Sequence, residues 1–130
     1  MAVNDNLANA LSLMLNNEKI GRTDCEVRPS FRLLREVLNI LKQNGYVESF
    51  EEVEDGKGNR IKLRLTGMIN KCGVIKPRFN VKLKDFERFE RTYLPSRDMG
   101  IIILSTNAGI MTHKDAKKKN LGGKLVAYCY

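Results

Sequence analysis

The sequence predicts an α+β fold made of two small packed α/β domains, residues 1–66 and 67–130. Two segments near the start carry apolar residues at helical spacing, segments of alternating polarity follow them, and two glycines bracket a junction near residue 70. The 130 residues, 42% hydrophobic and 29% charged, suffice for two such domains. We expect two helices on a short sheet in the N-terminal domain, and mainly strands with short helices in the C-terminal domain.

The first helix is expected to begin at a cap formed by Asn4 or Asp5 and to end at Gly21, because glycine favours a helix terminus. A second helix should follow the segment 28–30 and end at Gly45. Apolar residues mark one face of each helix: Leu7, Leu11, Met14 and Leu15 in the first, and Leu34, Val37, Leu38 and Leu41 in the second.

The sheet of the first domain should contain a short strand over Cys25–Val27 and two more strands on either side of a turn at residues 54–59. The last of these strands alternates apolar residues with basic ones: Ile61, Leu63 and Leu65 with Lys62 and Arg64. Alternation of this kind indicates one buried face and one solvent-exposed face.

The second domain should begin, after a junction at residues 66–73, with a strand over residues 78–84 that Pro77 confines to a sheet edge. Apolar and polar residues of this strand would face opposite sides, namely Phe79, Val81 and Leu83 against Arg78, Asn80, Lys82 and Lys84. Asp85 is expected to cap a short helix that reaches Tyr93.

The most apolar run, Ile101–Leu104, is typical of a strand that is buried on both faces. We expect a polar loop, Ser105–Gly109, directly after it, and then a short helix capped by Thr112 and Asp115. A turn and a final strand over residues 124–130 complete the domain.

The basic excess of the chain is confined to its second half. Residues 1–65 contain ten Lys or Arg and ten Asp or Glu, whereas residues 66–130 contain thirteen and five, which accounts for the whole net charge of +8. This asymmetry indicates a polyanionic partner, of which nucleic acid is the commonest, although an anionic membrane would attract the same charge. The alternative is a chance imbalance on solvated surfaces.

Several classes of protein are excluded. No apolar run approaches the ~20 residues that span a bilayer, and the first residues lack the pattern of a secretory signal. Cys25, Cys72 and Cys129 are far apart, which argues against a disulfide framework or a metal knuckle and favours a reducing cytoplasm. With His113 as the single histidine, we expect no metal site, no cofactor and no enzymatic activity.

Ser105, Thr106 and Asn107 are the sharpest candidates for a binding site. Their short hydroxyl and amide side chains can donate and accept hydrogen bonds at base edges or ribose hydroxyls, and they fit the shallow minor groove of an RNA helix. The alternative is an ordinary strand-to-helix turn whose polar side chains bind the backbone.

Two further pairs of residues support the same interpretation less directly. Gly122 and Gly123 form a tight turn or let a phosphate backbone come close. Lys117 and Lys118 belong either to the solvated face of a helix or to a phosphate clamp.

Two other functions stay open. A nucleic-acid-dependent hydrolase could use Ser105 and His113, although the chain has neither a Gly-x-Ser-x-Gly elbow nor a Gly-x-x-x-x-Gly-Lys phosphate loop. A protein-interaction module could bind partners through the first half, whose net charge is zero.

The second half also carries a specific combination of motifs. They are Asn70-Lys71-Cys72-Gly73-Val74-Ile75, Pro77-Arg78-Phe79, Leu94-Pro95-Ser96-Arg97, Ser105-Thr106-Asn107-Ala108-Gly109-Ile110-Met111-Thr112-His113 and Gly122-Gly123-Lys124. With Arg28-Pro29-Ser30 in the first half, they resemble, essentially end to end, the family of the eighth protein of the small ribosomal subunit, in its archaeal and eukaryotic cytosolic form.

The resemblance implies a cytoplasmic ribonucleoprotein component of translation that lacks enzymatic activity. Such a protein binds small-subunit rRNA directly, at its central domain, helps to fold the platform beside other ribosomal proteins, and is a monomer off the ribosome. Its C-terminal domain presents the Ser-Thr loop to the minor groove of a distorted RNA helix.

Carried over by position, the RNA-binding residues are Ser105, Thr106, Asn107, Gly122, Gly123 and Lys124, with Ser30 and Arg32 at a second rRNA segment. The chain departs from the family pattern at two positions. Asn107 stands where a small hydroxyl residue is common, and Ala108 where bacterial members often carry a cation.

Overall fold

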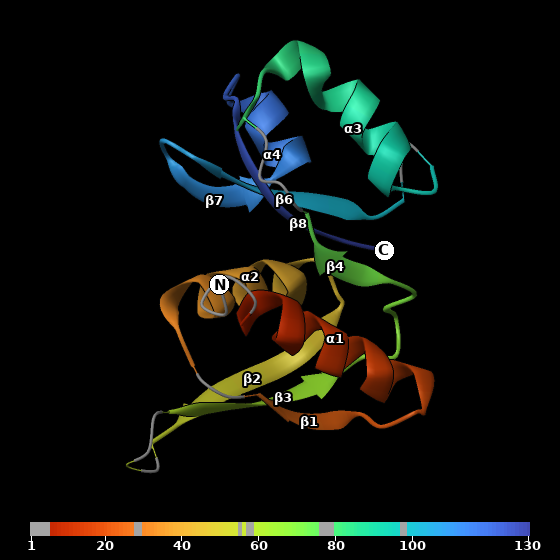
Figure 1. Ribbon diagram of the computed structural model, residues 1–130, viewed down its shortest axis with the longest axis vertical. Helices are drawn as coiled ribbons and strands as arrows, with labels where there is room; N and C mark the ends of the chain where they lie inside the picture. Colours follow the sequence, from red (N-terminus) through yellow and green to blue (C-terminus); the bar gives the residue numbers. More distant parts are fainter. Residues whose placement is uncertain (1–5, 28–29, 55, 57–58, 76–79, 97–98) are drawn as a thin grey trace. The chain divides into compact units, whose positions relative to one another are not determined.

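Contacts within the chain define an N-terminal unit, residues 1–70, and a C-terminal unit, residues 71–130. Both units combine helices with an antiparallel sheet, which confirms the predicted α+β class (Figure 1). The computed structural model describes residues 6–27, 30–54, 56, 59–75, 80–96 and 99–130.

In the N-terminal unit, two helices cover one face of a three-stranded sheet (Figure 1). The elements are α1 (Asn6–Lys19), β1 (Asp24–Val27), α2 (Arg32–Gln43), β2 (Val47–Val53) and β3 (Arg60–Leu65), with the strand order β1-β3-β2. Both helices end as predicted, because Gly21 and Gly45 have positive φ angles of 78° and 84° just after them. The expected caps Asn4 and Asp5, and the pair Arg28 and Pro29, lie outside the described residues.

The apolar faces predicted for the two helices are confirmed, and they form the core of this unit together with β3. Fully buried side chains come from each element: Leu7, Leu11 and Met14 of α1, Leu34, Leu38 and Leu41 of α2, and Ile61 and Leu65 of β3. Lys62 and Arg64 are exposed, as the alternation in the sequence predicts.

In the C-terminal unit, two helices cover one face of a five-stranded antiparallel sheet (Figure 1). Its elements are β4 (Cys72–Val74), β5 (Asn80–Val81), the 3-10 helix η2 (Leu83–Asp85), α3 (Phe86–Tyr93), β6 (Ile101–Thr106), β7 (Gly109–Thr112), α4 (His113–Lys118) and β8 (Gly123–Cys129). The strand order is β4-β8-β6-β7, and β5 pairs with β8 at the end away from β4.

The strand β6 is the centre of this sheet. All four residues of Ile101–Leu104 are buried, as predicted for a strand with two covered faces. Ile102 and Leu104 pack in one core with Leu125 of β8, Met111 of β7, Phe86 of α3 and Ala116 of α4. This core therefore marks the face of the sheet that α3 and α4 cover.

The strand expected over residues 78–84 is wrong in its second part. Of the described residues, β5 contains only Asn80 and Val81, and Leu83 begins η2 with an exposed side chain. The Asp85 carboxylate accepts a hydrogen bond from the backbone N–H of Lys82 at 3.4 Å, so Asp85 closes the η2 turn instead of capping α3. Pro77, Arg78 and Phe79 lie outside the described residues.

The loop expected over Ser105–Gly109 is also wrong. Ser105 and Thr106 end β6, Asn107 and Ala108 form a two-residue turn, and Gly109 begins the additional strand β7. The chain enters α4 only after β7.

Two smaller elements complete the comparison with the sequence. The predicted cap of α4 is confirmed, because Thr112 Oγ1 accepts a hydrogen bond from the Asp115 backbone N–H at 3.2 Å. Part of the predicted junction forms β4, because Cys72–Val74 pairs with the end of β8.

Candidate nucleic-acid interface

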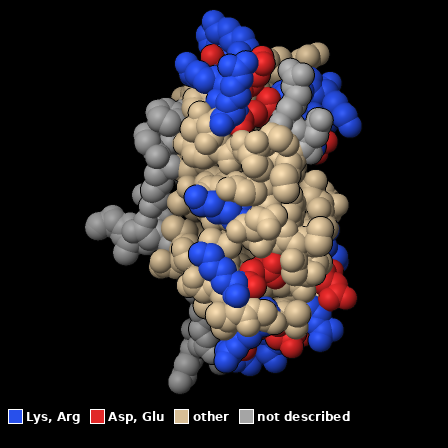
Figure 2. All heavy atoms as spheres, turned by 90° about the vertical axis from the view of Figure 1, so that its right-hand side faces the viewer, with Lys and Arg blue, Asp and Glu red and all other residues tan. Residues whose placement is uncertain are grey.

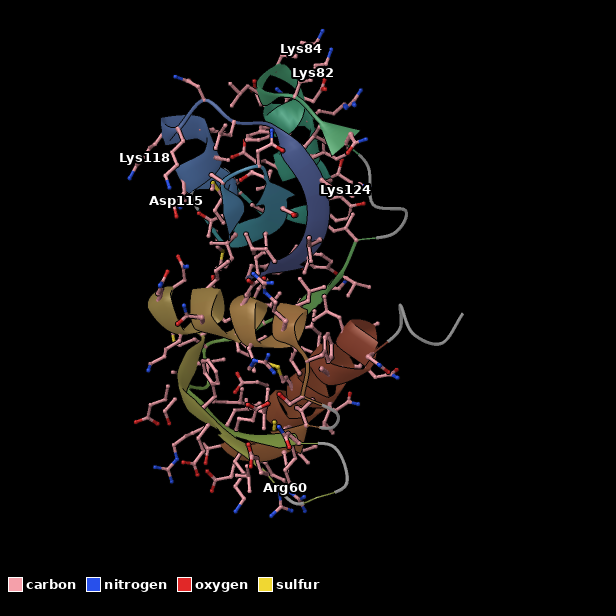
Figure 3. All side chains as sticks on the ribbon, turned by 90° about the vertical axis from the view of Figure 1, so that its left-hand side faces the viewer. Arg60, Lys82, Lys84, Asp115, Lys118 and Lys124 are labelled. Atoms are coloured by element: carbon pink, nitrogen blue, oxygen red, sulfur yellow. The ribbon has the colours of Figure 1, made fainter. Side chains whose placement is uncertain are left out.

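The described basic side chains of the C-terminal unit lie on more than one of its sides. On the face shown in Figure 2, Lys and Arg gather at the end of this unit near the start of α3, with acidic side chains between them. Figure 3 shows Lys82 and Lys84 together at that end, whereas Lys118 and Lys124 lie apart, toward opposite sides of the unit. Any one RNA surface can therefore use only part of the excess charge.

The tip of the β6–β7 hairpin carries the three sharpest candidates. Thr106 pairs with Gly109 across the turn, and its Oγ1 donates a hydrogen bond to the Gly109 carbonyl oxygen at 2.8 Å. The same hydroxyl accepts a hydrogen bond from the Ala108 backbone N–H at 3.1 Å. Thr106 therefore holds the turn, while Asn107 is exposed at its tip.

The hydroxyl of Ser105 is placed differently from that of Thr106. Ser105 is exposed, and its side chain makes no hydrogen bond with any described residue. Its cross-strand neighbour on β8 is Lys124, which is also exposed. The structure thus brings together a free hydroxyl and an ammonium group, which can respectively recognise a polar edge and a phosphate.

Gly123 lies beside the same hairpin and Gly122 lies beside β5, and the protein itself fills the space next to both. A Cβ at Gly123 would collide with the carbonyl oxygen of Ser105, and a Cβ at Gly122 would lie 2.5 Å from the carbonyl oxygen of Val81. Neither has a positive φ; the left-handed residue of the preceding turn is Asn120, with φ 56°. Both glycines therefore permit β8 to approach its neighbouring strands, which is a third role beside the two the sequence suggested.

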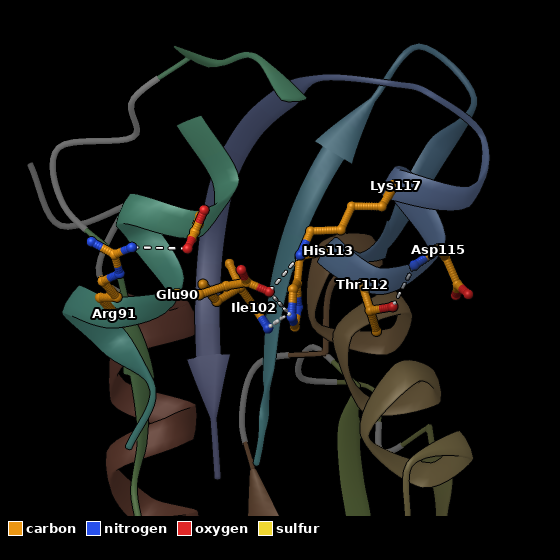
Figure 4. Close-up of polar contacts among 8 residues, drawn as sticks. Glu90, Arg91, Ile102, Thr112, His113, Asp115 and Lys117 are labelled. Carbon is orange, nitrogen blue, oxygen red and sulfur yellow. Dashed lines mark hydrogen bonds and ion pairs between the residues drawn. The ribbon is translucent and has the colours of Figure 1, made fainter. Parts of the chain in front are cut away.

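Lys117 has a carboxylate partner inside the protein. Its Nζ lies 2.7 Å from Oε1 of Glu90, a buried residue of α3 (Figure 4). The same carboxylate oxygen lies 3.0 Å from Nε2 of the buried His113, in a bent contact without good hydrogen-bond geometry. This ion pair links α3 to α4, and it neutralises Lys117 in the free protein. Lys118, by contrast, is exposed and has no ion pair with any described residue.

The His113 imidazole is in its neutral form. Its Nδ1 accepts a hydrogen bond from the Ile102 backbone N–H at 3.1 Å, so the ring proton resides on Nε2 and faces Glu90. Burial lowers the pKa of His113 below its usual 6.5, and the nearby charges of Lys117 and Lys114 act in the same direction, against the opposing effect of Glu90.

The pairing of Ser105 with His113, which a hydrolase would need, is not present. His113 is buried at one end of α4 and both its ring nitrogens face protein groups, whereas Ser105 is exposed on the opposite face of β6. Hydrolysis by this pair therefore has no geometric support.

Ser30 and Arg32 lie in the N-terminal unit and both contact acidic residues there. The Ser30 hydroxyl donates to Glu52 Oε2 and accepts from Arg35 Nη1 at 3.0 Å, and the hydrogen bond from Ser30 lowers the pKa of Glu52 below its usual 4.5. Arg32 pairs with Glu36 at 3.3 Å, and its side chain is 87% exposed. A single exposed pair of this kind binds weakly, so Arg32 can exchange its partner for another anion.

Other chemical sites have no support in the described part of the chain. No group of three or more His, Cys, Asp or Glu residues there could hold a metal ion. No described helix is long and apolar enough to cross a membrane. Cys72 and Cys129 are buried, and burial, as the largest effect, raises the pKa of the Cys25 thiol to about 11, which makes it a poor nucleophile.

The role of Glu90 escaped the sequence reasoning, although a signal for it was present. Glu90 lies four residues after Phe86 on α3, so the two side chains share the helix face that packs on the sheet. A carboxylate on an apolar helix face indicates a buried ion pair, and Lys117 was a cation within reach of the neighbouring helix.

Comparison with protein families gives a match over nearly the whole chain. The model of the family described as ribosomal protein S8 matches residues 5–130. The match includes both units and every candidate residue named above.

Proposed function

The chain belongs to the ribosomal protein S8 family, and from this premise we propose that it binds the central domain of small-subunit rRNA through the hairpin surface of its C-terminal unit. The hairpin surface is defined here as Ser105, Thr106, Asn107 and Lys124. Members of this family are structural, rRNA-binding proteins of the small ribosomal subunit and are not enzymes. A role in folding the platform during assembly, beside neighbouring ribosomal proteins, is part of the proposal.

The remaining expectations belong to the same proposal. The protein acts in the cytoplasm, as a monomer before it joins the subunit, and represents the archaeal or eukaryotic cytosolic form of the family. The motifs of the second half support the last point.

The observation that carries the proposal is the exposed hydroxyl of Ser105 beside the exposed ammonium group of Lys124, neither of which has a partner among the described residues. Lys124 neutralises a phosphate and supplies affinity, whereas Ser105 and Asn107 fix the register on an irregular helix. Lys117 contributes less, because Glu90 already balances its charge. Thr106 contributes by holding the turn that displays its neighbours.

The test measures binding to purified small-subunit rRNA, with nuclease footprinting to locate the site. Ser105→Ala should weaken binding by about 1–2 kcal/mol at fixed salt, because a polar RNA group loses its partner. The slope of log K against log salt should stay unchanged, since no phosphate contact is removed.

Lys124→Ala is the complementary variant. It should weaken binding to all RNAs alike and lower the salt slope by about one. Wild-type protein that protects no defined rRNA segment, or protects one outside the central domain, contradicts the proposal. If Ser105→Ala leaves the dissociation constant unchanged, the hairpin surface is not the RNA-binding site.

Contacts with proteins are assigned to the N-terminal unit, since its sheet has a separate, internally neutralised surface. On the face away from α1 and α2, Arg60 pairs with Glu26 at 2.9 Å, and Arg64 pairs with Asp24 at 3.2 Å and Glu48 at 4.0 Å. The arginines of β3 thus already have carboxylate partners from both flanking strands. This arrangement favours a polypeptide partner over a phosphate backbone.

A further inference from the structure

Four neighbouring strands of the C-terminal sheet contribute one side chain each to a cross-strand row. In order across the sheet, the row consists of Asn80 (β5), Lys124 (β8), Ser105 (β6) and Ile110 (β7). Partners in an antiparallel sheet stand about 5 Å apart, so the three polar members extend over roughly 10 Å.

The row lies on the face of the sheet that α3 and α4 leave uncovered. The sequence neighbours of its members all belong to the core under these helices: Val81, Leu125, Leu104 and Met111. Because successive side chains of a strand point to opposite faces, the four members of the row point away from that core.

The three polar members of the row are available to a ligand. Asn80, Lys124 and Ser105 are exposed, and none of their side chains has a hydrogen bond or ion pair with a described residue. An amide, an ammonium group and a hydroxyl thus stand side by side without partners in the part of the chain that the structure describes. The amide and the hydroxyl can each donate and accept, and the ammonium group only donates.

This combination suits the edge of an RNA helix better than unpaired bases. Recognition of unpaired bases depends on aromatic stacking, but the described aromatic side chains of this unit pack on the helix side, against the core: Phe86, Phe89, Tyr93, Tyr128 and Tyr130. Short polar side chains on a flat sheet can instead reach the 2′-hydroxyls and base edges in a wide, shallow minor groove.

We propose that Asn80 is a further RNA-reading residue, which extends the hairpin surface across β8 to the edge of the sheet. The inference rests on the proposed function. Its amide reads a ribose hydroxyl or base edge about 10 Å from the group that Ser105 reads, and Lys124 lies between the two contacts. The sequence alone placed Asn80 only on the polar face of a strand, whereas the pairing of β5 with β8 places it in line with Ser105.

The experiment compares Asn80→Ala, Ser105→Ala and a matched control, Asn39→Ala, for binding to purified small-subunit rRNA. Asn39 is an exposed asparagine on α2, outside the row. Asn80→Ala should weaken binding roughly 3- to 10-fold at fixed salt, with the salt slope unchanged. Asn39→Ala should bind like the wild type. Thermal unfolding of each variant checks that the fold is intact.

Footprinting gives a second readout. The nucleotides that lose protection in Asn80→Ala should lie next to, and differ from, those that lose protection in Ser105→Ala. Asn80→Asp should weaken binding further and also lower the salt slope, since a carboxylate beside Lys124 competes with phosphate.

The outcomes separate this inference from the proposed function. Wild-type affinity and protection in Asn80→Ala, together with weaker binding in Ser105→Ala, overturn the inference and leave the proposed function standing. Failure of the wild-type protein to bind rRNA specifically overturns both.

Discussion

Glu90 illustrates how one buried carboxylate shapes the C-terminal unit. It lies on the apolar face of α3 and holds Lys117 at 2.7 Å and His113 at 3.0 Å, both from α4. A buried charge without a partner is strongly unfavourable, so this carboxylate requires the two helices to dock together. The site therefore contributes to stability, and the lysine that serves it is not free for RNA.

Replacing Lys117 and Lys118 one at a time should distinguish the structural lysine from the free one. Lys117→Ala removes the cation from a buried acceptor and should lower the free energy of unfolding by about 1–3 kcal/mol. Lys118→Ala should change it by less than about 0.5 kcal/mol, because the described structure gives that side chain no partner. Chemical denaturation of both variants measures the difference, and equal stabilities would contradict the assignment of the ion pair.

The neutral His113 predicts a loss of stability in mild acid. Because its pKa is lowered in the folded state, the unfolded chain binds a proton first as the pH falls below about 6.5. The stabilisation is therefore complete above that pH and declines as the pH falls toward the lower, folded-state pKa. Protonation of Nδ1 would also break the hydrogen bond from the Ile102 backbone N–H.

Urea denaturation between pH 7.5 and 5.5 tests this prediction, with His113→Gln as the control. His113 is the single histidine of the chain, so no other side chain has an ordinary pKa in this range. The glutamine amide can accept from Ile102 and donate to Glu90 without titrating. The wild type should lose stability over this range and the variant should not; parallel curves would refute the role of His113.

At the scale of elements, the close packing of the start of β8 against its neighbouring strands requires glycine at positions 122 and 123. A Cβ at Gly123 would lie only 2.2 Å from the carbonyl oxygen of Ser105. Gly123→Ala should therefore push β8 from β6 and destabilise the unit by about 1–3 kcal/mol, as overpacking does.

Gly73→Ala on β4 is the matched control for Gly123→Ala. Its Cβ would meet only the Tyr128 side chain, at 3.3 Å from the hydroxyl oxygen, and an aromatic ring can shift slightly. Thermal unfolding should show a clear drop for Gly123→Ala and a small change for Gly73→Ala. A larger loss of thermal stability in Gly73→Ala than in Gly123→Ala would contradict the role of Gly123 in the packing of β8.

The sequence predicted best the elements whose signal is local. The helical spacing of Leu34, Val37 and Leu38 and the run Ile101–Leu104 led directly to α2 and β6, because burial imposes these patterns within one element. The strand β7 was missed, because it has four residues and its turn, Asn107–Ala108, is hidden within a polar run. A polar strand end and a polar loop have the same composition.

Much of the candidate site followed from the sequence, but the roles of its members did not. Ser105, Gly123 and Lys124 were all named in advance, and the structure does bring them together. The other roles depend on strand register. The pairing of β6 with β7 lets the Thr106 hydroxyl bind the Gly109 carbonyl oxygen, and the pairing of β5 with β8 places Asn80 beside Lys124. Register depends on residues far apart in the chain, which local patterns cannot reveal.

On the scale of the whole molecule, the charge is divided between two surfaces of different kinds. The N-terminal unit pairs its sheet arginines with carboxylates, whereas Lys118 and Lys124 of the C-terminal unit have no such partner among the described residues. Net charge alone would assign RNA affinity to every cation. The pairing removes Arg60 and Arg64 of the N-terminal sheet from that set.

Arg64→Ala and Lys124→Ala should separate these surfaces. Lys124→Ala should lower the slope of log K against log salt for rRNA binding by about one, since one phosphate contact is lost. Arg64→Ala should leave the slope unchanged, because Asp24 and Glu48 already hold its guanidinium group. A slope lowered equally by both variants would place RNA on the N-terminal sheet as well.

The two hydrogen bonds of the Thr106 hydroxyl order the hairpin turn in the free protein. These bonds fix Asn107 and Ala108 before any ligand arrives, so the hairpin is preorganised and forfeits little conformational entropy on association. The hairpin keeps its conformation on binding, so the RNA has to adapt its own conformation to the protein surface. We therefore expect the conformational change on binding to occur in the RNA and not in this hairpin.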